Sequence, residues 1–177
     1  MSILKIATIG HPVLREKARP IGMDELATPQ WQRFIDNLVE TMRDADGAGL
    51  AANQVYVPIR ICAVEVRADN PRYPEKEPIP LTVMVNPVIT PQSDKMFESF
   101  EGCLSIPDLR GKVARHHDLR VDFHDRYGEA KSIDVSGIQS VTYQHEVDHL
   151  NGILFVDKVS DKSTFTTWKN YRRHHRR

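Results

Sequence analysis

Residues 145–149 carry the residue types and spacing that point most directly to chemistry: His145-Glu146-Val147-Asp148-His149. On an α-helix, side chains four residues apart project from one face, so both imidazoles can bind one cation. Glu146 can reach a water on that cation without being a ligand itself. A motif this short also arises by chance, so its weight depends on its context. In a helical context it predicts metal-assisted hydrolysis with Glu146 as the base.

Two histidines do not complete a catalytic metal site, which needs about three protein ligands and one open position. The acidic residues downstream are Asp157 and Asp161, and the histidines there lie in the terminal tail. Upstream, Cys103 offers a thiolate, which is a strong soft ligand. A cysteine is also often a small buried hydrophobe, and Cys62, inside an apolar run, fits that interpretation better. Cys103 is therefore the candidate third ligand.

Residues 47–54 read G-x-G-L-A-A-x-Q, residues 101–105 read E-G-C-L-S, and residues 144–150 read Q-H-E-x-D-H-L. These three segments, in this order, resemble the motifs of the bacterial-type peptide deformylase family. Residues 10–15 are similar to the family's opening. The resemblance implies a hydrolase that removes the N-formyl group from the starting methionine of new polypeptides and releases formate. It implies an α+β fold, with mixed, mostly antiparallel β-sheets around a central helix carrying HExxH, and a C-terminal helix.

The resemblance also implies the roles of individual residues. One divalent ion is expected, usually Fe²⁺ in the family, with Zn²⁺, Ni²⁺ or Co²⁺ as substitutes. The side-chain amide of Gln54 and the backbone N–H of Leu104 are the implied oxyanion donors. The implied metal ligands are Cys103, His145 and His149.

A formylated peptide is extended, so backbone pairing along a strand edge is the expected docking mode. Gly49 and Gly102 are expected to let that backbone approach. Arg110 matches an arginine near the substrate entrance in the family, and a free surface arginine is the alternative. The methionine side chain needs an apolar pocket. Candidates for lining it, with core packing as the alternative, are Ile138, Val141 and Thr142.

HExxH alone also fits a metallopeptidase, which would cut internal peptide bonds. The missing downstream ligand and the presence of Cys103 argue against it. A metal-stabilised binding protein would need a fourth protein ligand, and none is obvious. An inactive deformylase paralogue would usually lose Glu146 or Gln54, and both are present.

Composition sets the broad class. The chain has 177 residues, of which 40% are hydrophobic, which is typical of a globular protein. The expected organisation is one catalytic domain over residues 1–167 followed by a basic tail over 168–177. No run approaches the roughly 20 apolar residues of a membrane span, and the N-terminus does not resemble a signal or transit segment. A cytoplasmic location is therefore expected.

The charge is unevenly distributed. Five of the 24 basic residues lie in the last ten positions, which hold no acid, so residues 1–167 have a net charge of −5. That body does not resemble a nucleic-acid-binding domain. The tail is interpreted either as a solvated terminus or as a contact to ribosomal RNA, for which related enzymes use a C-terminal helix. The expected partners are N-formylmethionyl nascent peptides and the ribosome, and neither a membrane nor DNA.

The elements that must position these residues follow from periodicity and breakers. A proline-rich surface loop is expected over 68–80, and Asp148 is expected to anchor its helix by pairing with Arg115. Because strands and helices do not alternate regularly, α+β is the expected class. Helices are predicted over 29–46, 138–150 and from about 163 into the tail, and strands over 59–66, 81–85, 112–124 and 130–135.

Overall fold

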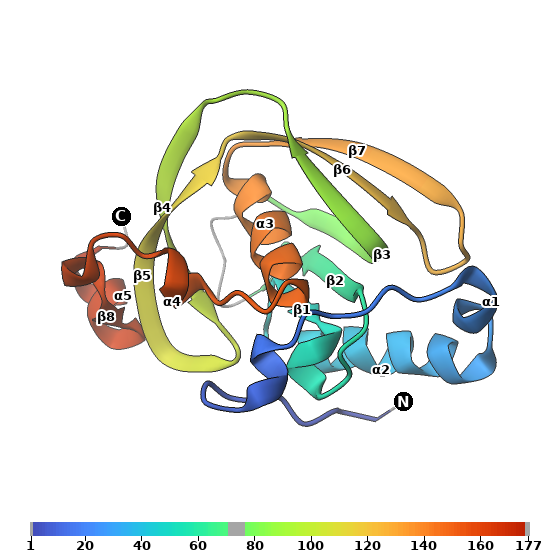
Figure 1. Cartoon of the computed structure of the whole chain (residues 1–177). Coiled ribbons are helices and arrows are strands. Elements are labelled where there is room, and N and C mark those ends of the chain that lie inside the picture. Colours follow the sequence, from blue (N-terminus) through green and yellow to red (C-terminus); the bar gives the residue numbers. More distant parts are fainter. Residues whose placement is uncertain (1, 71–76, 176–177) are drawn as a thin grey trace.

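Two antiparallel sheets form the scaffold of the chain, for which a computed structural model describes residues 2–70 and 77–175 (Figure 1). The five-stranded sheet has the order β1-β2-β3-β6-β7. Its strands are β1 (Gly49–Ala51), β2 (Ile61–Val66), β3 (Ile79–Pro91), β6 (Asp118–His124) and β7 (Ala130–Ser136). The second sheet has the order β4-β5-β8, with β4 (Met96–Cys103), β5 (Ile106–His116) and β8 (Thr166–Thr167). The α+β class with mostly antiparallel pairing is therefore confirmed.

Two longer helices cover opposite faces of the five-stranded sheet. The helices are α1 (Met23–Leu26), α2 (Pro29–Asp44), α3 (Ile138–Leu150), α4 (Phe155–Lys158) and α5 (Trp168–His174). Single 3-10 turns lie at Pro12–Arg15, Ala52–Val55 and Lys162–Thr164. The α2 helix packs its apolar stripe against one face, and α3 contacts strands of both sheets (Figure 1). Of the described residues, no helix is long and apolar enough to cross a membrane.

Strand β2 shows why its sequence is apolar on both sides. Cys62 and Val64 pack in the cluster that includes Tyr143 of α3, while Ile61 and Ala63 pack in the cluster of α2. Since alternate side chains point to opposite faces, a strand covered on both faces must be apolar throughout. The interpretation of Cys62 as a buried core residue is confirmed.

The α3 helix has the predicted bounds, 138–150, and carries residues 145–149 in its last turns. It begins after Gly137, whose φ of 62° suits glycine. Most of its faces are buried, which is why its apolar residues do not form a single stripe. The α2 helix also begins as expected, but the Thr28 hydroxyl donates to the carbonyl of Glu25 and does not cap the helix.

Several strand and helix boundaries differ from expectation. The helix predicted over 29–46 ends at Asp44, and the strand predicted over 59–66 begins at Ile61. The strand predicted over 81–85 does not end at Asn86-Pro87, because a bulge with Asn86 at φ 52° carries β3 past the proline to Pro91. The helix predicted from about 163 begins at Trp168, because Thr166 and Thr167 pair with β5 first. In the predicted loop 68–80, residues 71–76 lie outside the described part and Ile79 already starts β3.

The strand predicted over 112–124 is two strands in different sheets. The apolar residues on either side, Val113 before the crossing at His117 and Leu119 and Val121 after it, stay in phase, so periodicity does not reveal the crossing. Gln144 of α3 holds the crossing: its side chain accepts from the N–H of His116 at 3.2 Å and donates to the carbonyl of His116 at 3.0 Å. The hairpin of β6 and β7 around 125–128 is confirmed. The switch of sheets lets β4 and β5 stand across α3 from the larger sheet.

Candidate metal centre

The end of β4 and the last turns of α3 bring three potential metal ligands together. The Sγ atom of Cys103 lies 3.2 Å from Nε2 of His149, and the two histidine Nε2 atoms lie 3.2 Å apart. All three donor atoms fall within 4.8 Å of one another. Cys103 and His149 are buried, and the His145 side chain is 11% exposed. The residues predicted as metal ligands therefore form one cluster that could hold an ion.

The orientation of His145 is set by Glu101, two residues before Cys103 on β4. Nδ1 of His145 and Oε2 of Glu101 are 2.8 Å apart, which turns Nε2 towards the cluster. Glu101 also accepts from Nε and Nη2 of Arg115 at 2.6 and 3.0 Å. Sequence reasoning missed this role of Glu101, although its position two residues before Cys103 puts both side chains on the same face of β4.

Arg115 continues this network to the helix. Its Nη1 donates to Asp148 at 2.5 Å, so the predicted pairing of Asp148 with Arg115 is confirmed. Lys158 of α4 approaches the other oxygen of Asp148 at 3.4 Å. Because Arg115 is buried, its two carboxylate partners tie β4, β5 and α3 into one unit.

The two histidines of the cluster have pKa values shifted in opposite directions. Burial acts to raise the pKa of Glu101, but hydrogen bonds from His145 and Arg115 outweigh it and bring the pKa to about 2. Burial lowers the pKa of His149 well below its usual value and favours the neutral imidazole that binds cations. Burial also acts to lower the pKa of His145, but the Cys103 sulfur and Glu101 raise it well above its usual value. The Cys103 sulfur and the Glu101 carboxylate, which favour a proton on His145, would likewise attract a metal cation.

Glu146 follows His145 on α3 and has a carboxylate oxygen without a hydrogen-bond partner in the described residues. That oxygen is Oε2, and the side chain is buried. Burial raises its pKa to about 7, and nearby His145 acts in the opposite direction. A Cβ on Gly49 would overlap the Glu146 carboxylate, so glycine at this place in β1 makes room for Glu146. Sequence reasoning gave Gly49 only the task of admitting a substrate.

The outer edge of β1 faces away from β2. The carbonyl of Ala48 accepts from the N–H of Glu65 on the β2 side. Because antiparallel pairing alternates, the N–H and C=O of Gly49 point to the opposite edge. The edge position of β1 in its sheet is matched by β4, which is the edge strand of the other sheet. Both edge strands lead into the cluster, β1 through Gln54 and β4 through Cys103.

Gln54 reaches the cluster from the 3-10 turn Ala52–Val55. Its Oε1 accepts from the N–H of Ala51 at 2.9 Å, which orients the amide. Its Nε2 donates to Oγ of Ser105 at 3.0 Å and lies 3.5 Å from Sγ of Cys103. Leu104 lies in the turn between β4 and β5, next to Cys103. The two predicted oxyanion donors thus flank the cysteine, and Ser105 was not anticipated.

Arg110 is not a free surface arginine. It is 5% exposed on β5, opposite Gly102 of β4, and its Cζ lies 4.3 Å from the ring centroid of Trp168. A Cβ on Gly102 would lie 2.5 Å from that Cζ. The alternative of a surface arginine is therefore wrong, and the room made by Gly102 is taken by Arg110.

The three residues predicted to line an apolar pocket lie on the first turns of α3. Ile138 is 42% exposed, whereas Val141 and Thr142 are buried. Burial therefore increases along α3 from its start towards His145.

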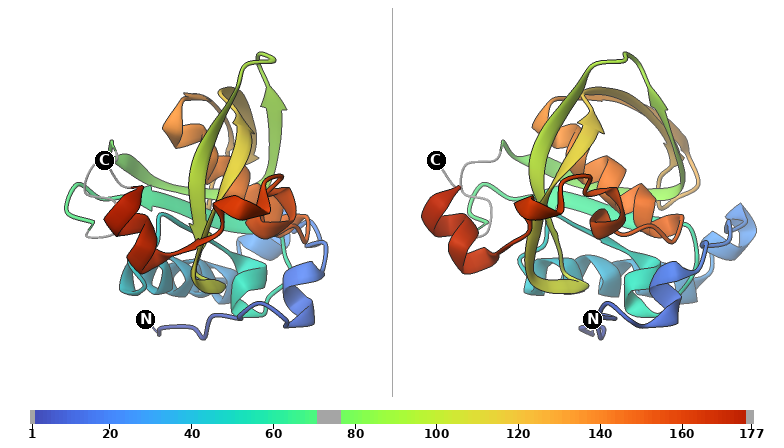
Figure 2. Two further views of the ribbon diagram at one scale, coloured as in Figure 1. Left: turned by 90° about the vertical axis from the view of Figure 1, so that its left-hand side faces the viewer. Right: turned by 60° about the vertical axis from the view of Figure 1, so that its left-hand side comes forward.

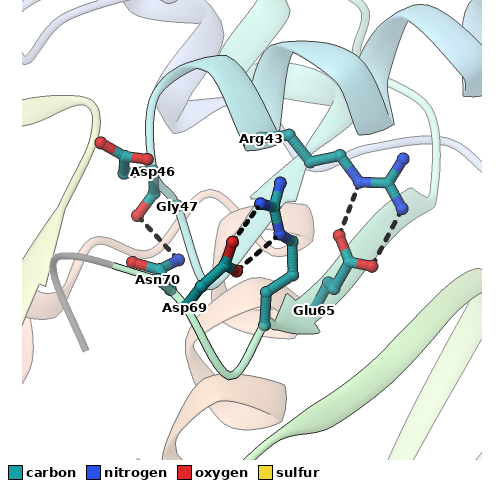
Figure 3. A pocket seen from close by; sticks show the side chains of 7 residues that line it. Arg43, Asp46, Gly47, Glu65, Asp69 and Asn70 are labelled. Carbon is teal, nitrogen blue, oxygen red and sulfur yellow. Dashed lines mark hydrogen bonds and ion pairs between the residues drawn. The ribbon is translucent and has the colours of Figure 1, made fainter. Parts of the chain in front are cut away.

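Away from the cluster, a hollow lies at the C-terminal end of α2, next to Gly47 (Figure 3). Four of its charged side chains form two pairs: Arg43 with Glu65 at 2.7 and 2.9 Å, and Arg67 with Asp69 at 3.0 and 2.8 Å. These internal pairs give the hollow no group comparable to the Cys103 cluster.

Comparisons with known proteins agree with this geometry. Residues 3–165 match the polypeptide deformylase family. A peptide deformylase of Leptospira biflexa is 39% identical over 166 residues, which cover 93% of this chain and 92% of that one. Peptide deformylase 1A of Arabidopsis thaliana, chloroplastic/mitochondrial, is 41% identical over 94% of this chain and 64% of that one.

Solved structures are similar over nearly the whole fold. The Met-Ala-Ser-bound class I type b peptide deformylase of Acinetobacter baumannii superposes with a TM-score of 0.85 at 39% identity, covering 89% of this chain and 99% of that one. The Thermotoga maritima peptide deformylase gives a TM-score of 0.78 at 30% identity, covering 91% of this chain and 100% of that one.

Proposed function

The chain belongs to the polypeptide deformylase family, and we propose that the Cys103, His145 and His149 cluster is the centre of its reaction. The protein is a hydrolase that removes the N-formyl group from the N-terminal methionine of nascent polypeptides and releases formate. The observation that carries the assignment of the centre is the convergence of three donor atoms beside the unpartnered carboxylate of Glu146.

One divalent ion fits the cluster. A thiolate and two imidazoles make a three-ligand set that leaves a coordination position open. The native ion is proposed to be Fe²⁺, with Zn²⁺, Ni²⁺ or Co²⁺ as substitutes. When bound, such an ion acts as a Lewis acid that lowers the pKa of a water and polarises a carbonyl group.

Glu146 moves the proton. Its carboxylate accepts a proton from the attacking water and delivers it to the amine nitrogen as the formyl C–N bond breaks. The position beside Gly49 and the absence of a hydrogen-bond partner on Oε2 in the described residues keep that oxygen available. Gln54 Nε2 and the Leu104 N–H donate to the formyl oxygen as negative charge develops on it.

The substrate docks as an extended chain between the two edge strands. Its formyl end lies near Gln54 and Cys103, so the peptide runs back along β1. There it pairs with the N–H and C=O groups of Gly49, which point away from β2. Gly102 and Arg110 border it on the β4 side. The methionine side chain is received by the apolar region that Ile138, Val141 and Thr142 contribute on α3.

The reaction is tested with formyl-Met-Ala-Ser against acetyl-Met-Ala-Ser, using protein purified without oxygen and analysed for metal. Formyl-specific amine release is expected, and Glu146→Ala should lower kcat by about 10²–10⁴. Glu25→Ala, a change in an exposed ion pair, is the matched control. Cleavage of internal peptide bonds would instead support a metallopeptidase. No release from a folded, Fe²⁺- or Ni²⁺-loaded sample would support an inactive paralogue.

We also propose that the basic tail contacts ribosomal RNA and that the enzyme works in the cytoplasm on chains leaving the ribosome. On α5, Lys169, Arg172 and Arg173 are exposed, while Tyr171 packs on Phe100. Residues 176–177 of the predicted tail lie outside the described part. Reversing the charge of Arg172 and Arg173 should leave activity on short peptides intact and weaken salt-dependent ribosome binding. Unchanged ribosome affinity would refute this contact.

A further inference from the structure

The C-terminal segment is seated on the side of β5 that faces away from α3 (Figure 2). Thr166 and Thr167 of β8 pair with Arg110 and Leu109 of β5. Directly after this pairing, Trp168 begins α5 and places its ring over the Arg110 guanidinium, 4.3 Å from its Cζ. The segment is therefore fixed at the residue of β5 that lies opposite Gly102.

A second contact holds the other end of α5. Phe100, two residues before Gly102 on β4, packs edge-on against Tyr171 with ring centroids 5.1 Å apart. The ring of His175 lies 5.0 Å from the same phenylalanine. Since Phe100 and Gly102 share one face of β4, α5 covers the face of β4 opposite to the one that carries Glu101.

The stack has three layers: the Trp168 ring, the Arg110 guanidinium and the Gly102 backbone. A charged side chain that is 5% exposed needs partners that compensate its lost hydration. The π face of tryptophan is the strongest aromatic partner for a guanidinium. On the other side the guanidinium touches the backbone so closely that any side chain at position 102 would collide with it.

We propose that Trp168 is a positioning residue for the deformylation reaction, holding Arg110 against Gly102 at the strand edge that receives the formyl peptide. This rests on the proposed docking of the peptide between β1 and β4. A guanidinium held there presents donors to the carbonyl or carboxylate oxygens of the peptide. The C-terminal segment thereby belongs to the peptide-binding site, at the side away from the proton-transfer residue Glu146.

The test separates binding from chemistry. Trp168→Ala should raise KM for formyl-Met-Ala-Ser about tenfold, the size expected from losing a partly desolvated cation–π contact, with kcat changed less than about twofold. Trp168→Phe, which keeps a π face, should recover most of the loss. In an Arg110→Ala background, Trp168→Ala should add almost nothing, because the two residues act as one unit.

The chain has two tryptophans, which supplies both a control and a probe. Trp31 packs on Phe34 of α2, so Trp31→Ala tests general destabilisation and should leave KM unchanged. In Trp31→Phe, Trp168 is the single tryptophan, and its fluorescence should change when the product Met-Ala-Ser binds.

Four results would overturn the proposal: an unchanged KM in Trp168→Ala, no rescue by phenylalanine, additive effects with Arg110→Ala, or a silent Trp168 fluorescence on saturation with Met-Ala-Ser. A wild-type enzyme without formyl release would refute the proposed function instead. The fluorescence titration would still decide whether Trp168 responds to the peptide.

Discussion

The two faces of the β4–β5 hairpin hold buried arginines in different ways. On the inner face, towards α3, Arg115 makes a bidentate ion pair with Glu101 and a further bond to Asp148. On the outer face, under α5, Arg110 stacks on the ring of Trp168. Paired N–H···O bonds fix both distance and direction, whereas a stacked cation tolerates small shifts across the ring. The rigid face orients a proposed metal ligand, and the more adaptable face borders the proposed path of the peptide.

The difference teaches where precision is needed. His145 must present one nitrogen to an ion, so Glu101 holds the other nitrogen at 2.8 Å. A peptide of varying sequence needs a border that adjusts, and the contacts of α5 with Phe100 are between rings. Substitutions on the inner face should therefore damage stability and metal binding, and substitutions on the outer face should act on substrate affinity.

The largest effect is expected from Arg115→Met. It leaves the buried carboxylate of Glu101 without its cationic partner, which should lower the free energy of unfolding by about 3–5 kcal/mol. Arg110→Met is the matched change on the outer face. Chemical denaturation of the two variants and of the wild type measures the loss in the free energy of unfolding. Equal losses in the two variants would break the distinction between the faces.

Gly49→Ala should lower kcat about a hundredfold, because the added methyl group displaces the carboxylate of Glu146 and with it the proton transfer. Gly102→Ala is the matched change, since its methyl group meets Arg110, and it should raise KM instead. Steady-state kinetics on formyl-Met-Ala-Ser distinguish the two outcomes. A KM effect at Gly49 with normal kcat would show that its main task is to admit the peptide.

Glu101→Gln should weaken metal binding about 10–100-fold, the usual cost of losing the partner that orients a ligating histidine. The amide keeps the shape but removes the charge beside His145. Competition with a chelator of known affinity measures the change. Metal retention equal to wild type would mean that α3 alone orients the ring.

The smallest effect is expected from Lys112→Ala on the outer face. The exposed ammonium lies 5.5 Å from the Phe100 ring, a contact worth about 0.5–1 kcal/mol of unfolding free energy. Thermal unfolding should detect at most that loss, with KM and metal content unchanged. A rise in KM as large as that of Trp168→Ala would make the whole outer face, and not the Arg110 stack, responsible for peptide affinity.

The sequence predicts the cluster because motif and period agree. His145 and His149 are four residues apart in a predicted helix, and the resemblance of residues 101–105 to the family motif adds Cys103. Glu101 escapes this reasoning because a carboxylate beside a motif is ordinary on a surface, and only the packing of β4 against α3 turns it towards His145. The sequence suggests a site role for Arg110 but not its burial, since the ring that covers it belongs to a residue 58 positions later.

The fold is predictable where periodicity and breakers carry the information, and not where the chain changes partners. The α3 bounds and the β6–β7 hairpin are confirmed, since each depends on local signals. The crossing at His117 keeps Val113 and Leu119 in phase while moving the chain to another sheet. Its stabilising contact, the Gln144 amide on the backbone of His116, is a long-range hydrogen bond that no local pattern encodes.

The long separation of the potential ligands along the sequence has a consequence for folding kinetics. Cys103 and His149 are 46 positions apart, and the β6–β7 hairpin lies between them. The donor set therefore exists only after α3 has docked on the β4–β5 hairpin, a non-local step that closes a long loop. An ion in the cluster acts as a reversible cross-link across that loop. It would tie the end of β4 to α3, so the loaded chain should unfold more slowly than the metal-free chain.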